Sequence, residues 1–454
     1  MGTTAALPYD PASRRSIVEY AHLLVGSTLR EQTGVASIAS PQRRKGSFGN
    51  AVEEHFFGYA PNSAARADFP QAGLELKTTP LKRAKRGGYV AKERLVFCML
   101  NFGGVVDETF ETSTLLAKCS DILLISYLWE PEVDPLDYVI LIADEWTLPA
   151  QDMPQFKRDW ETVVAKVRAG RAHEISGSDT LYLEACTKGK DSSARTSQPF
   201  SDIPAKPRAW ALKASYMTAI SQGLLEQMET LQREQGEEDI DVLTLVRKRF
   251  EPYFGMTETE LERALSCPWA QTSKRRPKHA CALMTNRILG VGDDAKIAEF
   301  EKAGIKPKTM RLQRNGRPKE AVSFPAFDYC ALALTDFEDS DFLCYLQQRW
   351  LFVVYREDDQ QRGVYRLNDV MLWQMPDDDI GEARRCYEEM RERVMSGHAE
   401  QAVRSSENRC CHVRPHGKNA ADTCMTPYGV PVKKQCFWLN QGYLQGEIAR
   451  LSRT

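Results

Sequence analysis

The sequence predicts a mixed α/β (α+β) fold that occurs twice in tandem along the chain. Segments in which apolar and polar residues alternate with the period of a β-strand are interspersed with longer segments that have the period of a helix. The chain also resembles itself at a nearly constant spacing of 227 to 231 residues, which predicts two copies of one fold. The matching positions are Gly26 and Gly255, Gly73 and Gly304, Gly170 and Gly397, and Tyr216 and Tyr443.

Length and composition agree with this prediction. The 454 residues are enough for about two to three domains, and 42% hydrophobic and 27% charged residues are usual for globular proteins. The net charge of −2 argues against a uniformly basic surface but not against basic patches. No apolar run is long enough for a membrane span, the N-terminus does not resemble a signal peptide, and the twelve cysteines follow no disulfide pattern. We therefore expect a cytoplasmic protein with free thiols and no membrane partner.

The first copy begins with two expected helices. Apolar residues recur on one face of residues 12–32, which predicts a helix there. A second helix is expected over residues 45–58, with Ser47 as its capping residue. Glu53 lies on this second helix.

Strands and one long helix follow. Residues 73–78 alternate between apolar and polar types, and the later strand segments are short apolar runs. Further strands are expected over residues 94–100, 121–128, 138–143 and 180–185, and a helix over residues 153–169.

The repeat also predicts the domain boundaries. We expect a first domain over residues 1–221 and a second over residues 240–454. Residues 222–239 between them carry a run of charges, which is typical of a solvated linker helix.

Asp68, Glu75 and Lys77 form the most informative cluster of the first copy. Glu75 and Lys77 share one face of the expected strand, and the turn before this strand can bring Asp68 beside Glu75. Two neighbouring carboxylates repel each other unless a cation lies between them, and Mg²⁺ takes oxygen ligands of this kind. A lysine beside such a metal can orient a water or neutralise a phosphate, as in metal-dependent nucleases. By itself, Glu-x-Lys on a strand is more often a solvated surface ion pair.

The second copy has lost this cluster. Glu299, Lys306 and Lys308 stand at the three equivalent positions, and Pro307 interrupts the hydrogen-bonding pattern of the strand. One carboxylate and two lysines cannot hold Mg²⁺ in the same way, so we do not expect the second copy to be a nuclease.

Basic turns follow the strand in both copies. Such turns are typical of a DNA-binding surface, although both could also be ordinary solvated loops. The candidate DNA-binding residues are Lys82, Arg83, Lys85 and Arg86 in the first copy and Arg311, Arg314 and Arg317 in the second.

These motifs resemble the MutH family of mismatch-repair endonucleases. The resemblance is carried by Lys45-Gly-x-x-Gly-x-x-x-Glu53, by Asp68 and by Gly73-Leu-Glu75-Leu-Lys77-Thr, and it extends to Lys118 and Tyr182. It implies that each copy is a restriction-endonuclease-like (PD-(D/E)XK) domain with a mixed central sheet flanked by helices. The two-copy layout resembles the type II (type IIE) restriction endonucleases of this family, which cut at GATC and use a degenerate C-terminal copy as an allosteric effector domain.

The resemblance also implies residue roles. Asp68 and Glu75 would bind Mg²⁺, Lys77 would position the attacking water and Glu53 would support the metal site. Lys118 and Tyr182 would contact DNA. The implied reaction is hydrolysis of a phosphodiester in double-stranded DNA that leaves a 5′-phosphate.

The implied partners are double-stranded DNA, at one site or at two sites at once, and a cognate DNA methyltransferase of the same restriction–modification system that need not be bound. The chain would act as a monomer or as a DNA-induced dimer. Two alternatives stay open: a strand-nicking mismatch-repair endonuclease, and a non-catalytic DNA-binding regulatory protein.

Overall fold

The computed structural model describes residues 7–37, 47–61, 67–84, 88–189, 193–223, 229–271, 276–293, 295–337, 340–417, 419 and 421–452. The chain divides into two compact units. The first comprises residues 1–228, 233–241 and 301–303, and the second comprises residues 229–232, 242–300 and 304–454. Among the described residues, no helix combines the length and the apolar character needed to cross a membrane.

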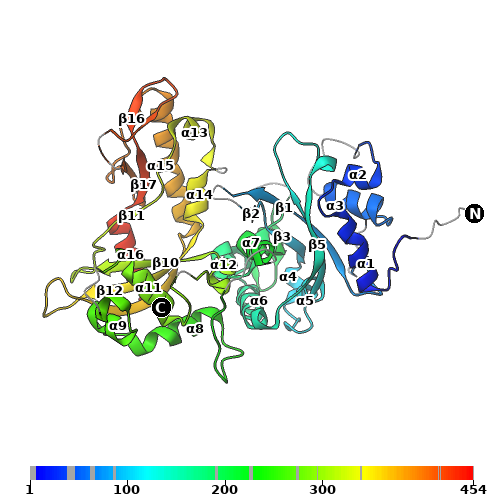
Figure 1. Ribbon diagram of the computed structural model, residues 1–454, viewed down its shortest axis with the longest axis horizontal. Coiled ribbons are helices and arrows are strands. Elements are labelled where there is room, and N and C mark those ends of the chain that lie inside the picture. Colours follow the sequence, from blue (N-terminus) through cyan, green and yellow to red (C-terminus); the bar gives the residue numbers. More distant parts are fainter. Residues whose placement is uncertain are drawn as a thin grey trace, which may run out of the picture. The chain divides into compact units, whose positions relative to one another are not determined.

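The first unit contains the elements α1 to α7 and β1 to β9 (Figure 1). Its helices are α1 (Arg14–Ala21), α2 (Leu29–Thr33), α3 (Ser47–Ala51), α4 (Phe102–Val105), α5 (Thr114–Cys119), α6 (Met153–Arg168) and α7 (Ala214–Gly223). Its strands are β1 (Glu75–Arg83), β2 (Tyr89–Ala91), β3 (Leu95–Leu100), β4 (Asp121–Leu128), β5 (Ile140–Thr147), β6 (Leu183–Thr187), β7 (Thr196–Gln198), β8 (Ser201–Ala205) and β9 (Arg208–Leu212).

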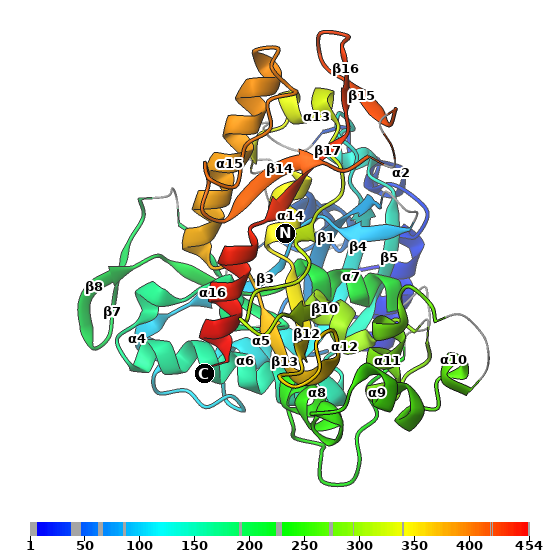
Figure 2. The same ribbon diagram turned by 90° about the vertical axis from the view of Figure 1, so that its left-hand side faces the viewer.

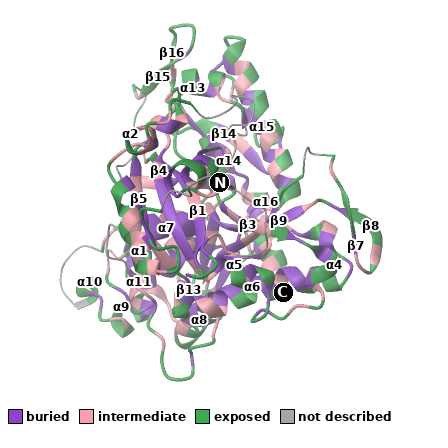
Figure 3. Cartoon of the chain, turned by 90° about the vertical axis from the view of Figure 1, so that its right-hand side faces the viewer, coloured by how far each residue is buried: buried purple, intermediate pink, exposed green. Residues whose placement is uncertain are grey.

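Two sheets and a hairpin organise this unit. The larger sheet has the strand order β2-β1-β4-β5, in which β1 and β4 are parallel and the other pairs are antiparallel. Residues 122–125 in β4 are apolar and buried on both faces of the sheet, as expected for a central strand that is covered on both sides (purple in Figure 3). The second sheet, β3-β9-β6, is antiparallel, and β7 and β8 form a separate hairpin.

The second unit contains α8 to α16 and β10 to β17 (Figure 2). Its helices are α8 (Val242–Phe250), α9 (Glu258–Ala264), α10 (Pro268–Gln271), α11 (Ala280–Ile288), α12 (Ala298–Ala303, whose last three residues are grouped with the first unit), α13 (Tyr329–Leu334), α14 (Asp341–Leu346), α15 (Asp377–Met395) and α16 (Gln441–Leu451). Its strands are β10 (Ile305–Leu312), β11 (Val322–Ser323), β12 (Arg349–Glu357), β13 (Tyr365–Trp373), β14 (Cys411–Pro415), β15 (Thr423–Met425), β16 (Pro431–Lys433) and β17 (Gln435–Leu439).

The two units share one topology, which confirms the prediction of a tandem α/β fold. The sheet β10-β12-β13 repeats β1-β4-β5, with a parallel pair followed by an antiparallel pair. The antiparallel sheet β11-β17-β14 repeats β3-β9-β6, and the hairpin β15-β16 repeats β7-β8. The main difference is that, in the described part of the second unit, no strand takes the place that β2 has beside β1. Among the described residues, only the isolated bridge between Leu312 and Pro318 flanks β10, so β10 is an edge strand and can accommodate Pro307.

The predicted helix over residues 12–32 is interrupted. The side chain of Ser13 caps α1, but Val25 is extended and Gly26 has a φ of 79°, which ends the helical path. Thr28 then caps the separate helix α2 through a capping box. The expectation of one continuous helix is therefore wrong.

The linker helix predicted over residues 222–239 is also wrong for residues 229–239, whereas residues 222 and 223 are the end of α7. Residues 229–241 form extended segments and turns, and Gly236 has a φ of 88°. Leu231 and Glu237 are buried in this segment, although its charge run suggested a solvated helix. The guanidinium of Arg233 donates to the main-chain oxygens of Glu237 and Ile240 and so holds the turn in a non-helical form.

The expected strands agree more closely. The strand expected over residues 121–128 has the same bounds as β4, and the helix expected over residues 153–169 corresponds to α6. The strand expected over residues 138–143 lies at residues 140–147, and the one expected over residues 180–185 lies at residues 183–187.

Candidate active site

The turn before β1 brings Asp68 beside the start of that strand. Phe69 and Leu74 exchange two main-chain hydrogen bonds of 2.9 and 3.2 Å, and Gly73 between them has a φ of 63°. This closed turn lets the Oδ2 atom of Asp68 accept a hydrogen bond of 2.9 Å from the amide of Leu76. Burial and the neighbouring charge of Glu75 raise the pKa of Asp68.

Glu75 is the first residue of β1 and is held by two lysines. Its Oε1 atom accepts from the Nζ atom of Lys77 at 2.6 Å, and its Oε2 atom accepts from the Nζ atom of Lys118 at 3.0 Å. The Lys77 ammonium also donates to the carbonyl of Leu76 at 3.2 Å. Glu75 and Lys118 are only 5% and 8% exposed, and buried charges of this kind require partners of opposite sign.

Glu53 faces the same place from a distorted helical turn. The helix α3 continues into a π-helical turn over Val52–Phe56, a deviation often found at functional sites. Burial, together with the negative charges of Asp68 and Glu75, raises the pKa of Glu53 to about 7, although the ammonium of Lys77 opposes this shift. Three carboxyl groups from separate parts of the first unit therefore influence one another.

A buried hydroxyl lies close to these carboxyl groups. Burial raises the pKa of Tyr59 well above its ordinary value, and the charges of Asp68, Glu53 and Glu75 add to this effect. The Tyr59 hydroxyl has no hydrogen-bond partner among the described residues. An unsatisfied polar atom beside several carboxylates is typical of a place that takes a water or an ion.

The donor set of this site fits a hard divalent cation. Mg²⁺ uses one or two carboxylates and completes its shell with water or phosphate oxygens, and Asp68, Glu75 and the carbonyl of Leu76 supply oxygens of this kind. The described residues contain no group of three or more His, Cys, Asp or Glu side chains arranged around one metal position. A two-carboxylate site with added phosphate and water is therefore the arrangement that these residues can offer.

Two residues expected to contact DNA have other positions. Tyr182 is completely buried, with its ring 5.1 Å from that of Tyr216 and 6.1 Å from that of Phe156, so it belongs to the core. Lys118 is buried and donates to Glu75. Lys118 therefore belongs to the carboxylate cluster, and the DNA contacts expected of Tyr182 and Lys118 stay predictions.

The basic turn of the first unit is only partly described. Lys82 and Arg83 are exposed at the end of β1, and the Nε atom of Arg83 lies 3.9 Å from the carboxylate of Glu130. Lys85 and Arg86 lie outside the described residues.

The equivalent positions of the second unit have a different chemistry. Glu299 accepts hydrogen bonds of 3.2 and 3.1 Å from the amide of Leu231, so its carboxylate has a structural partner. Lys306 and Lys308 lie on β10, and burial lowers the pKa of Lys308, which lies 5.9 Å from the ring centre of Trp350.

The three arginines expected to bind DNA in the second unit differ in their surroundings. Arg311 is paired with Glu258 at 2.8 Å and is the least available of the three. Arg314 and Arg317 are exposed and donate to uncharged groups, the carbonyl of Asp358 and the side chain of Gln441.

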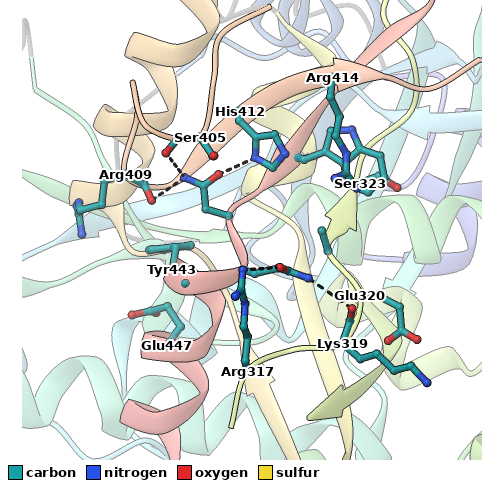
Figure 4. A pocket seen from close by; sticks show the side chains of 16 residues that line it. Arg317, Lys319, Glu320, Ser323, Ser405, Arg409, His412, Arg414, Tyr443 and Glu447 are labelled. Carbon is teal, nitrogen blue, oxygen red and sulfur yellow. Dashed lines mark hydrogen bonds between the residues drawn. The ribbon is translucent and has the colours of Figure 1, made fainter. Parts of the chain in front are cut away.

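A groove of about 1220 Å³ in the second unit was not foreseen from the sequence (Figure 4). It includes Arg317, but most of its lining had not been assigned to a site from the sequence, for example Arg409, Arg414 and Trp438. No local sequence pattern indicates this groove, because its residues come from three separate segments, at positions 317–323, 405–414 and 438–447.

Comparison with known proteins identifies relatives of both units. The family model for the DNA mismatch repair enzyme MutH matches residues 57–159 and 292–383, once in each copy. The type II restriction enzyme Sau3AI of Staphylococcus aureus is 29% identical over 97% of this chain and 99% of its own length. The mismatch repair protein MutH of Serratia proteamaculans is 26% identical over 48% of this chain and 97% of its own length, and the protein of Haemophilus ducreyi is 26% identical over 49% and 99%.

Proposed function

Because the chain belongs to the family of MutH-like endonucleases, we propose that it is a type II restriction endonuclease, a site-specific deoxyribonuclease that cuts double-stranded DNA. The observation that carries this proposal is the extent of the similarity. The restriction enzyme aligns with both copies, whereas the repair proteins align along nearly their full length with only about half of this chain. A second copy is therefore a feature shared with the restriction enzyme.

We assign the chemistry to the first unit. Asp68 and Glu75 would hold Mg²⁺, with the carbonyl of Leu76 as a further oxygen donor. When bound, the ion would polarise the scissile phosphate and lower the pKa of a water molecule. Lys77 would orient that water and offset the charge that develops on the phosphate, and the product would carry a 5′-phosphate.

The remaining residues of the site would position these groups. Lys118 holds the second oxygen of Glu75 and so fixes the orientation of the carboxylate. Glu53 would support the metal site from the π-helical turn. Lys82 and Arg83 at the end of β1, together with Lys85 and Arg86, would contact DNA phosphates.

The second unit would bind DNA without cutting it. Its lysines at the positions of Glu75 and Lys77 exclude a similar cation site, while Arg314 and Arg317 stay exposed. We propose that this unit binds a second DNA site as an allosteric effector. The family resemblance supports GATC as the target, a cytoplasmic location and a cognate methyltransferase.

Digestion of methylated and unmethylated plasmids with purified full-length protein and Mg²⁺ tests this proposal. We expect double-strand cuts at one fixed sequence and 5′-phosphate ends, with methylated plasmid protected. Nicks in one strand only would favour the repair-type alternative. Sequence-specific binding without any cutting would favour the regulatory protein.

A further inference from the structure

The groove of the second unit lies between the antiparallel sheet and the start of α16. β14 contributes His412 and Arg414, β17 contributes Trp438, and the segment between β10 and β11 contributes Arg317 and Lys319. Figure 4 shows His412 and Arg414 on one side of the hollow and Arg317 and Lys319 on the other. All residues that line the groove belong to this unit.

The charge of the groove favours an anionic ligand. Within the described residues, no carboxylate lies within 4.0 Å of the charged groups of Arg317, Lys319 or Arg414, and all three side chains are exposed. The two carboxylates of the lining each have a cationic neighbour that does not itself line the groove. Glu320 lies 3.6 Å from Arg311, and Glu447 lies 2.9 Å from Arg450.

An aromatic stack lies at one side of the groove. The guanidinium of Arg414 lies 3.6 Å from the ring centre of Trp438, and the ring of His412 lies at 6.4 Å and nearly parallel to the indole. His412 and Trp438 are directly paired on neighbouring strands. A guanidinium placed over an indole in this way still has N–H groups with which it can donate to a ligand.

A fixed hydrogen-bond network orients His412. The Nδ2 atom of Asn440 donates to the carbonyls of Asn408 at 2.7 Å and Arg409 at 3.0 Å, which directs its Oδ1 atom towards His412. This Oδ1 atom accepts from the Nδ1 atom of His412 at 2.6 Å. The neutral imidazole therefore carries its proton on Nδ1 and offers Nε2 as an acceptor beside the donors of Arg414.

The first unit lacks this arrangement at the same register. Glu184 pairs with Ala211 on β6 and β9, where the second unit pairs His412 with Trp438. Glu184 is held by Arg94, and an alanine cannot serve as a stacking platform. The stack is thus specific to the copy that has lost the acidic site.

We propose that this groove is a double-stranded DNA site in which Arg317 and Lys319 contact phosphates, while Arg414 and His412 read a base edge. The inference rests on the proposed function in taking DNA as the ligand. An acceptor beside a donor complements a base edge that shows an amino group next to a ring nitrogen or carbonyl, as adenine and the G·C pair do in the major groove. Lysine and arginine contacts to phosphate position the duplex but do not distinguish sequences.

Calorimetric titration of the full-length protein in EDTA tests the site with three short duplexes. The first contains the sequence identified by the plasmid digestion, the second has the same base pairs in permuted order, and the third replaces the target adenines by purine, which lacks the amino group. The wild type should bind two target duplexes per chain. In the Arg414→Ala and His412→Ala variants, the affinity of the second site for the target duplex should fall roughly 10- to 100-fold. It should then be close to the affinity of that site for the permuted duplex.

Two further variants separate base reading from phosphate contact. The double change Arg317→Gln and Lys319→Gln should weaken the binding of the target duplex and of the permuted duplex by the same factor. It should also reduce the slope of log affinity against log salt concentration by about two. Arg362→Gln, an exposed arginine of the β12–β13 turn outside the groove, should behave as wild type. Thermal unfolding of each variant shows whether it is folded. Because Arg414 is exposed, its replacement should affect the stability of the fold least.

The outcomes are distinguishable. If wild type binds two duplexes and every groove variant binds them equally well, the groove is not the site, although a second DNA site exists. If His412→Ala keeps the full preference for the target over the purine duplex, His412 is not a base reader. If wild type binds one duplex per chain, the effector part of the proposed function fails and this inference fails with it.

Discussion

β1 and β10 occupy the same place in two copies of one fold, yet at one matched position β1 carries the carboxylate of Glu75 and β10 carries the ammonium of Lys306. β1 carries Glu75 between the ammonium groups of Lys77 and Lys118, whereas β10 carries Lys306 and Lys308. The sheets around them keep the same strand order and the same parallel pairing. The fold therefore does not depend on the acidic cluster, so this cluster is best explained by function.

The second difference concerns what each unit offers to DNA. The first unit gathers carboxyl groups at the start of β1, and the second unit opens a basic groove against its antiparallel sheet. A unit that lost metal-binding residues while keeping cations can hold a phosphate backbone without cleaving it. Substitutions at matched positions of β1 and β10 test whether the first unit cleaves DNA and the second unit only binds it.

The largest effect is expected from Glu75→Ala. This change removes one carboxylate of the proposed metal site and should reduce DNA cleavage by roughly 1000-fold or more. DNA affinity should stay within about twofold, because Glu75 makes no favourable contact with an anionic backbone. Cleavage rates and gel-shift affinities of the purified variant measure both quantities. The matched change Lys306→Ala should not lower single-site cleavage, and a similar loss in both variants would contradict the comparison.

Lys77→Met should have the next largest effect. Loss of the ammonium removes charge stabilisation at the phosphate and should lower the cleavage rate by roughly 100-fold at saturating DNA. Lys308→Met at the matched position of β10 serves as the control and should leave the single-turnover rate unchanged. Full activity of the Lys77→Met protein under single-turnover conditions would rule out the assigned role.

Lys118→Met separates a positioning role from a DNA contact. Because Lys118 holds the Oε2 atom of Glu75, its loss should lower cleavage by roughly 10- to 100-fold while the affinity for DNA changes little. Measurements of the cleavage rate and of the binding constant at several salt concentrations distinguish the two roles. A drop in affinity with a smaller salt dependence would assign Lys118 to DNA binding instead.

Glu53→Gln should alter the pH dependence of stability by a smaller amount. The pKa of Glu53 is about 7 in the folded protein and 4.5 in its ordinary state, so the folded protein binds the proton more tightly. Without divalent ions, the free energy of unfolding of the wild type should therefore fall as pH rises from about 4.5 to about 7, relative to the variant. We expect a difference on the order of 1 kcal/mol after solvent screening of this half-buried group.

Urea unfolding between pH 4 and pH 8 measures this difference. Glu54→Gln, a change of the exposed neighbour on the same turn, is the matched control and should follow the wild type. Parallel pH profiles of the wild type and the Glu53→Gln variant would show that Glu53 does not titrate in this range.

The sequence predicted the repeated fold because its strongest signals are local. Residues 122–125 form a short apolar run that is typical of a buried strand, and the apolar residues of the alternating segment around Glu75, Leu74 and Leu76, are buried in the structure. The helix break was harder to foresee, because the amide of Gly26 donates to the main-chain carbonyl of Ile140, which is far away in the sequence. The segment around Glu237 resembled a solvated helix because composition does not show which charged residues become buried.

The site was predictable only where its residues are close in sequence. Asp68, Glu75 and Lys77 lie within one turn and strand, and the structure brings them together. The contact between Lys118 and Glu75 joins residues 43 positions apart, and the groove around Trp438 joins residues farther apart still. Such contacts follow from strand pairing and helix packing, which a single sequence does not encode locally.

The central claim is that the first unit alone holds the divalent ion. Titration of the DNA-free full-length protein with Mn²⁺, followed by electron paramagnetic resonance of the free ion, tests it most directly. The account predicts saturable binding that is lost in Asp68→Asn and retained in Glu299→Gln, the change at the equivalent position of the second unit. Binding that survives Asp68→Asn, or that disappears in Glu299→Gln, would contradict it.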